Sequence, residues 1–188
     1  GTGDKDTTRR ELGFDFDSTA LTVGTDYRFS DELVGGIALS LGQSEVDYAL
    51  NQGDTENDSY SLTLYGTYYV DNWYVDGVLG FSRHDYDNTR NLQLSNLIAG
   101  LPPSLLGDQL IKSSTDGDAL NWSIGGGYSH SIKKWTNNYS VRLEGVDGTI
   151  DGYTEDQSNS LALIVGDQDV ESLQLIVAGQ FNRSYSYD

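Results

Sequence analysis

The stretch YSLTLYGTYYVDNWYVDGVLGFSRHDYDNTR, residues 60–90, contains two runs of alternating residues joined by a very short polar turn. Side chains two positions apart lie on the same face of a strand, and one face is apolar, aromatic or glycine throughout residues 60–70 and 73–81. Asp71 and Asn72 separate the two runs, and both residue types suit a tight hairpin because they tolerate left-handed backbone angles. The pattern predicts a β-hairpin with one apolar face and one face of small and polar residues.

Aromatic side chains cluster beside this turn. Tyr68 and Trp73 lie near the ends of the two apolar faces, and Tyr69 and Tyr74 follow slightly further off. Amphipathic aromatic residues gather at a common depth where a protein meets the boundary between a membrane and water. The hairpin therefore indicates strands that lie in a lipid bilayer.

The composition excludes several classes of protein. With 188 residues, the whole of 1–188 is expected to form a single domain. The net charge of −18 argues against binding to nucleic acid, which needs clustered Lys and Arg. Because the chain has no cysteine, neither a disulfide framework nor a thiolate metal site can form. No apolar run reaches the roughly 18 residues of a transmembrane helix, whereas the alternating strands of a membrane barrel tolerate low overall hydropathy.

The same alternation recurs along the chain and predicts seven strands. They fall at residues 18–29, 33–48, 60–70, 73–90, 120–129, 139–153 and 173–181. Residues 1–17 and the acidic stretch 51–58 are expected to be loops. Long connections are also expected between residues 90 and 118 and over residues 155–169, where residues 161–165 could add a strand extension.

Short and long connections alternate in this prediction. Tight turns near Asp31, Asp71 and Lys134 would lie at one end of the sheet and the long loops at the other. An apolar island at residues 97–106 is interpreted as a helical turn or as a plug that enters a lumen. This plan is typical of an all-β, antiparallel up-and-down outer-membrane barrel with periplasmic turns and extracellular loops. A soluble sandwich would more often mix its connections in Greek keys.

The two faces of the predicted strands differ in chemistry. The polar face carries charges that are costly in lipid but acceptable in a wet lumen, so we expect it to face the pore. Its charged residues are Asp26, Arg28, Asp76, Arg142 and Glu144. We expect the opposite face to contact lipid and to form an aromatic girdle. Its aromatic residues are Tyr27, Tyr68, Trp73, Phe81, Trp122, Tyr128, Tyr139 and Phe181. Arg142 and Glu144 lie on one face of one strand and could pair with charges across the lumen. A structural ion-pair network is preferred over the alternative, contacts to a helix that passes through the lumen.

Three segments carry a resemblance to a known family. They are Gly24, Asp26, Tyr27, Arg28 and Ser30; Asp76, Gly77, Gly80, Asp85, Tyr86 and Arg90; and Gly152, Tyr153, Glu155, Glu171, Ser172 and Leu173. In this order, over nearly the whole chain, they resemble the translocator β-domain of autotransporters, the type V secretion family. The resemblance implies a twelve-stranded barrel in the bacterial outer membrane, threaded by a helix, which anchors a passenger domain and mediates its passage to the cell surface. It implies as partners membrane lipids, lipopolysaccharide, the protein's own passenger and the outer-membrane assembly machinery.

The number of strands departs from that family pattern. The seven strands correspond to about the second to the eighth of twelve, without the linker helix, the first strand and the last four strands. Seven strands cannot close a barrel of this size, and an open sheet edge in lipid leaves backbone groups unsatisfied. Because the sequence also begins without Met, we expect a fragment of a longer protein or a chain that associates with another piece.

Residues suited to catalysis or metal binding are sparse. His84 and His130 are the only histidines, and neither a G-x-S-x-G elbow nor an H-E-x-x-H pair accompanies them. Acidic groups such as Asp54 and Glu56 match no calcium-binding loop and are interpreted as solvated surface charge. Residues 125–127, all glycine, are expected to permit bending or close packing against a lumenal element. We therefore predict no catalytic residue, cofactor or metal site. The alternative function is a soluble or surface-exposed adhesin-like domain, with its apolar faces in a sandwich core.

Overall fold

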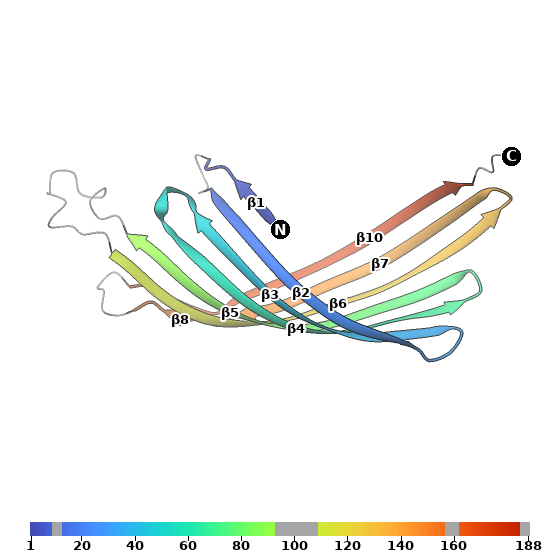
Figure 1. Cartoon of the computed structure of the whole chain (residues 1–188), viewed down its shortest axis with the longest axis horizontal. Coiled ribbons are helices and arrows are strands. Elements are labelled where there is room, and N and C mark those ends of the chain that lie inside the picture. Colours follow the sequence, from blue (N-terminus) through green and yellow to red (C-terminus); the bar gives the residue numbers. More distant parts are fainter. Residues whose placement is uncertain (9–12, 93–108, 157–161, 185–188) are drawn as a thin grey trace.

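A computed structural model describes residues 1–8, 13–92, 109–156 and 162–184 (Figure 1). Apart from one 3₁₀ turn, η1 (Ala49–Asn51), the regular secondary structure of these residues is all β. The strands are β1 (Thr2–Lys5), β2 (Phe14–Arg28), β3 (Leu33–Tyr48), β4 (Gly53–Val70), β5 (Trp73–Leu92), β6 (Gln109–Ile132), β7 (Trp135–Ile150), β8 (Tyr153–Thr154), β9 (Ile164–Val165) and β10 (Gln168–Arg183). The predicted fold class is confirmed.

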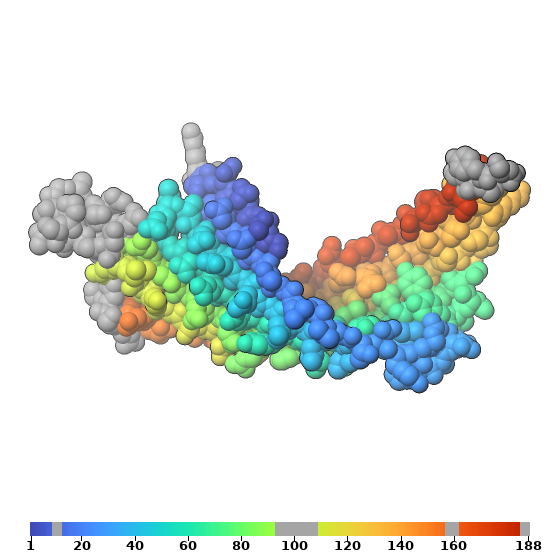
Figure 2. Space-filling model, in the orientation of Figure 1, coloured from blue at the N-terminus to red at the C-terminus, as the bar shows by residue number. Residues whose placement is uncertain are grey.

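Eight of these strands form one antiparallel sheet in the order β1-β2-β3-β4-β5-β6-β7-β10, and β8 pairs with β9 in a separate hairpin. Each long strand thus pairs with the next long strand along the chain, which is the predicted up-and-down meander. The sheet is curled into a half-barrel, with β2 in front and β10 more distant (Figure 1). In the space-filling view the N-terminal strands and β10 rise on opposite sides of a hollow (Figure 2).

Three tight connections, β2–β3, β4–β5 and β6–β7, lie together at one end of the sheet, which we call the turn end; the opposite end is the loop end (Figure 1). In the β2–β3 turn, the Ser30 hydroxyl accepts hydrogen bonds from the backbone N–H groups of Glu32 and Leu33. Asp71 has a φ of 51° in the two-residue β4–β5 turn, and Lys133 has a φ of 57° in the β6–β7 turn. The left-handed backbone angle predicted for the turn at Asp71 and Asn72 is confirmed at Asp71.

The register of the sheet places all the predicted apolar faces on one side. Ile37 of β3 pairs with Leu64 of β4, which pairs with Leu79 of β5, which in turn pairs with Trp122 of β6. Residues that pair across neighbouring strands point to the same face, and the ladders run without a slip from β2 to β10. One face of the sheet is therefore apolar from edge to edge.

Burial on the two faces is the reverse of that in a soluble protein. Among the described residues the buried hydrophobic core consists of Ile111 alone, whereas Leu39 of the apolar face is 61% exposed and Val177 is 71% exposed. On β3, by contrast, polar-face neighbours of Leu39 such as Ala38 and Ser40 are half-buried. Side chains on the inside of a curled sheet crowd together, so the polar face is the inner face and the apolar face is the outer one.

Several predicted loops are strands instead. Residues 1–17 contain β1 and the start of β2, and only residues 49–52 connect β3 to β4, so that most of 51–58 belongs to β4. The long connection after residue 90 is also shorter, because β5 ends at Leu92 and β6 begins at Gln109. Strands of up to 24 residues, in β6, far exceed the roughly 9–11 that cross a bilayer. Towards the loop end, for example between Gly53 and Ser59 of β4, both faces carry polar residues, and the alternation that predicts a strand is lost.

Smaller differences affect the second half of the chain. The turn after β6 is confined to two residues, so that Trp135 already begins β7, and β7 ends at Ile150. Within the predicted connection 155–169, the strand extension at residues 161–165 is confirmed in part by β9, and β10 already begins at Gln168. The apolar island at residues 97–106 lies outside the described residues. In the part of the chain that the structure describes, no helix is long and apolar enough to cross a membrane.

Candidate functional site

The five charged residues predicted on the polar face all lie on the inner face of the sheet. Asp76 pairs in register with Gly125, which pairs with Arg142, so these residues form a row across β5, β6 and β7. Glu144 pairs with Ser123 one step further along β7. Arg28 and Asp26 lie on β2, at the other side of the sheet. Their predicted contact with a pore or a transiting helix stays a prediction.

Arg142 and Asp76 form an ion pair that passes over an intervening strand. The Nη2 atom of Arg142 lies 2.6 Å from Oδ2 of Asp76, and Nη1 donates a hydrogen bond of 3.1 Å to the Ser123 hydroxyl. Glu144 is at the margin of this cluster, with Oε1 3.9 Å from Nε of Arg142. The side chain of Asp76 is only 13% exposed and that of Arg142 is 34% exposed. Arg142 therefore pairs within one wall of the sheet and not across a lumen as expected, and the choice between a structural network and contacts to a transiting helix stays a prediction.

Gly125 makes this ion pair possible. A Cβ atom at this position would lie 3.1 Å from Oδ1 of Asp76 and 3.4 Å from Cζ of Arg142. Without a side chain on β6, the two charged groups meet directly above the backbone. At Gly127 the added Cβ would overlap the ring of Tyr74. The close packing predicted for this glycine run therefore involves side chains of the neighbouring strands.

Asp26 and Arg28 do not join that cluster. Both are exposed, and Arg28 donates from Nη1 to the carbonyl oxygen of Asp31 at 3.1 Å. This contact links the end of β2 to its own turn. The inner face thus carries one compact ion-pair cluster on β5 to β7 and separate charges near the turn end of β2.

A second ion pair on the inner face was not predicted as a site. Arg90, near the loop end of β5, binds both carboxylate oxygens of Glu155, which follows β8. Glu155 is only 5% exposed. The hydrogen bond from Arg90 is the main reason why the pKa of Glu155 lies below its ordinary value, and it outweighs the opposing effect of burial. The signal in the sequence was that both residues belong to the family-like segments, although 65 positions separate them.

The eight aromatic residues predicted for the lipid-facing side all lie on the outer face. Several gather near the turn end: the rings of Trp73 and Tyr128 are 4.6 Å apart, and those of Tyr139 and Phe181 are 5.9 Å apart. Tyr128 also pairs in register with Tyr139. The other members of this turn-end group are Tyr27 and Tyr68.

Two of the eight lie elsewhere on that face. Trp122 is in the middle of β6, and its indole covers Gly145 of β7. Phe81 is closer to the loop end, where it pairs in register with Leu62 and Leu120. Contact of the eight residues with lipid remains a prediction.

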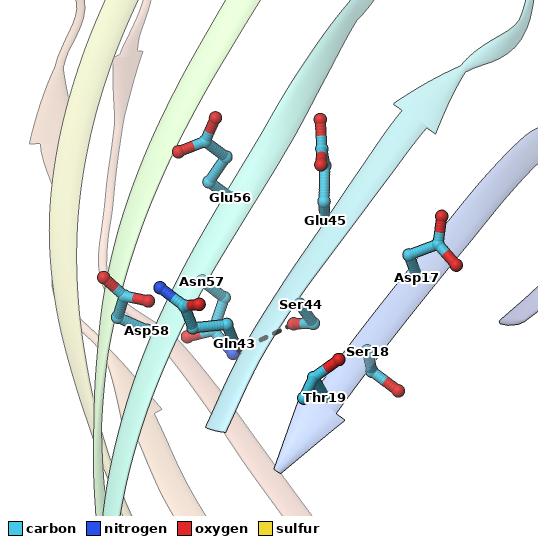
Figure 3. Close-up of a pocket in the computed structure, with 9 residues that line it drawn as sticks. All are labelled: Asp17, Ser18, Thr19, Gln43, Ser44, Glu45, Glu56, Asn57 and Asp58. Carbon is cyan, nitrogen blue, oxygen red and sulfur yellow. Dashed lines mark hydrogen bonds between the residues drawn. The ribbon is translucent and has the colours of Figure 1, made fainter. Parts of the chain in front are cut away.

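Beyond the apolar side chains, towards the loop end, the outer face is strongly acidic. Asp17, Glu45, Glu56 and Asp87 stand directly opposite one another on four neighbouring strands. Figure 3 shows the first three of these carboxylates projecting from β2, β3 and β4 around a shallow pocket. Like charges in register destabilise a sheet unless water and salt screen them. The interpretation as solvated charge agrees with their exposure, but these residues lie on strands.

The described residues contain no group of three or more His, Cys, Asp or Glu side chains suited to holding a metal ion. The Nε2 atom of His84 and the Ser82 hydroxyl form one hydrogen bond of 3.0 Å, in which either group can be the donor. Its Nδ1 atom is buried without a hydrogen-bond partner among the described residues. His130 stacks on Tyr128, with ring centroids 6.0 Å apart. Neither histidine is held by a carboxylate in the way that a Ser-His-Asp triad requires.

A curled antiparallel sheet with an exposed apolar outer face and a polar inner face defines part of a transmembrane β-barrel. A family model described as the autotransporter beta-domain matches residues 1–188. The chain belongs to this family, which confirms the resemblance seen in the sequence. No curated protein matches the chain.

Solved structures of two autotransporters share the fold. The translocator domain of NalP from Neisseria meningitidis superposes with a TM-score of 0.74 at 14% identity over 98% of this chain, which spans 60% of that domain. The β-domain of the Bordetella autotransporter BrkA gives a TM-score of 0.61 at 17% identity, covering 99% of this chain and 68% of that domain. BauA, the ferric preacinetobactin receptor of Acinetobacter baumannii, gives 0.59 at 11% identity, with coverage of 96% and 33%. At these identities the likeness establishes the fold.

Proposed function

We propose that the chain is part of an outer-membrane β-barrel translocator of type V secretion, which anchors a passenger domain and exports it to the cell surface. The observation that carries this proposal is the reversal of the two faces: apolar side chains are exposed on the outer face, whereas the inner face is polar and more enclosed. A soluble protein would bury such an apolar surface, but lipid tails cover it in a membrane.

The height of the apolar band supports this proposal. On β4 every outward side chain from Tyr60 to Val70 is apolar, aromatic or glycine, and these ten residue steps span about 34 Å along the strand. At a tilt of about 35–45°, which is usual for outer-membrane barrels, the run has a height of about 24–28 Å, and a typical apolar band is about 25 Å tall. The next outward residues, Asp58 and Glu56, begin the acidic zone.

The proposal also assigns an orientation and partners. The turn end faces the periplasm and the loop end faces the cell exterior. The outer face contacts membrane lipids and lipopolysaccharide, and the barrel works with its own passenger domain and with the outer-membrane assembly machinery. No catalytic role is assigned to the chain. Further strands, from the rest of the protein or from another piece, would cover the edges that the described sheet leaves open, along β1 and β2 on one side and along β10 on the other.

Two substitutions on neighbouring positions of β4 test the proposal. Leu64→Arg places a charge on the outer face near the middle of the band and should cost about 2–4 kcal/mol of folding free energy in lipid vesicles. Ser61→Arg places the same charge on the inner face, where we expect it to be tolerated. Equal costs on the two faces would contradict a membrane position. The alternative, a soluble adhesin-like domain, requires instead that the protein stay folded and monomeric without any amphiphile.

A further inference from the structure

The β8–β9 hairpin continues the wall of the barrel beyond the end of β7. The N–H of Asp151 donates to the carbonyl oxygen of Asp116 at 2.8 Å, and the N–H of Asp156 donates to that of Lys112 at 3.0 Å. Both acceptors belong to β6. The hairpin therefore lies along the part of β6 that projects past β7, at the rim of the loop end.

One buried carboxylate joins this hairpin to the inner face. Arg90 donates two hydrogen bonds to the carboxylate of Glu155, from Nε to Oε1 at 2.8 Å and from Nη2 to Oε2 at 2.5 Å. The guanidinium is thus bound at two points. Oε2 also accepts the N–H of Leu163, from the returning side of the hairpin, at 2.8 Å. The N–H of Glu155 in turn donates to the carbonyl oxygen of Leu163 at 3.0 Å. A single side chain thus ties β5 to both sides of the hairpin.

The ion pair reaches across the intervening strand on its inner side. Arg90 pairs in register with Ile111 of β6, and Ile111 is the residue that is only 2% exposed. Glu155 must therefore extend over the inner surface of β6 to meet Arg90. A bidentate pair of buried charges has strong directional preference, and removal of either partner leaves the other charge buried and unpaired.

We propose that Arg90 and Glu155 form a latch that holds the β8–β9 hairpin against β6, in line with β7 at the loop end of the wall, and that the hairpin keeps this position only while the pair is intact. The latch rests only on the contacts of the described residues and is independent of the proposed function.

The test uses the full protein that carries this chain, folded in detergent and in lipid vesicles. Glu155→Gln and Arg90→Gln each remove one charge, and the double variant R90E/E155R restores the pair in reverse. Arg83→Gln is the matched control, because Arg83 lies on the same strand but pairs with Asp116 on the outer face, where both side chains are about half exposed. Hydrogen exchange of the backbone at residues 153–156 and 163–165 reports on the hairpin directly.

The two single variants should speed exchange of these amides at least about tenfold, as expected for the loss of a buried charge-assisted hydrogen bond. The reversed pair should restore slow exchange, and Arg83→Gln should leave it unchanged. Unchanged exchange in the single variants would overturn the latch. Failure of the wild-type protein to insert into lipid vesicles would refute the proposed function, whereas the exchange comparison in detergent would still decide the latch.

Discussion

The ion pair between Asp76 and Arg142, on the inner face of the sheet, should stabilise the fold measurably. Replacement of Arg142 by Met keeps the length of the side chain but leaves the Asp76 carboxylate, which is 13% exposed, without its cation. Breaking a fully buried pair costs about 3–5 kcal/mol. Because Arg142 is 34% exposed, solvent compensates part of this loss, and we expect about 2 kcal/mol.

Urea unfolding in detergent micelles, followed by circular dichroism, measures this effect. With a slope of about 2 kcal/mol per molar urea, the midpoint should fall by about 1 M. The exposed outer-face pair of Arg83 and Asp116 is the control, since removal of such a pair costs about 0–1 kcal/mol. Asp76→Asn and the double variant complete a thermodynamic cycle. A coupling energy within about 0.5 kcal/mol of zero would refute the argument, because it would mean that the two side chains do not interact in solution.

Gly125 offers an independent check of the same geometry. A valine at this position would place its Cβ against both charged groups, so Gly125→Val should destabilise the wild-type protein. In the Arg142→Met background the space above Gly125 is less crowded, and the same substitution should cost less. Additive effects of the two substitutions would show that the ion pair does not pass over β6 as the structure has it.

Two further predictions concern the ends of the sheet. Because the pKa of Glu155 is lowered, its pair with Arg90 stabilises the hairpin at every pH above the ordinary glutamate pKa and is lost only as the pH falls through the lowered value. If amide protection at residues 153–156 is already lost near neutral pH as the pH is lowered, this prediction is contradicted. Asp71→Ala should destabilise the β4–β5 hairpin by about 1 kcal/mol, because alanine tolerates a φ of 51° poorly, and Asp71→Gly should be nearly neutral in the same urea experiment.

The sequence predicts the membrane part of each strand and fails for the parts outside it. Between Tyr60 and Val70 the alternation between the two faces is complete, as expected where one face meets lipid and the other meets water. Between Gly53 and Ser59 both faces are polar, with Asp and Glu on the outer face and Thr, Asn and Ser on the inner one. Nothing in such a segment distinguishes a strand from a loop, since the energy that makes it a strand comes from the ladders with β3 and β5.

The inner-face contacts show a second limit of prediction from the sequence. Alternation assigns Asp76 and Arg142 to one face, but it does not reveal that they meet, because the two residues lie on strands that do not pair with each other. The contact depends on the register of β6 between them and on the glycine that this register places at the crossing point. Curvature adds the remaining condition: side chains converge only on the concave side of a curled sheet. Arg90 and Glu155 meet over Ile111 under the same condition, so both pairs should weaken together in any variant that flattens the sheet, whereas the exposed pair of Arg83 and Asp116 on the convex side should not.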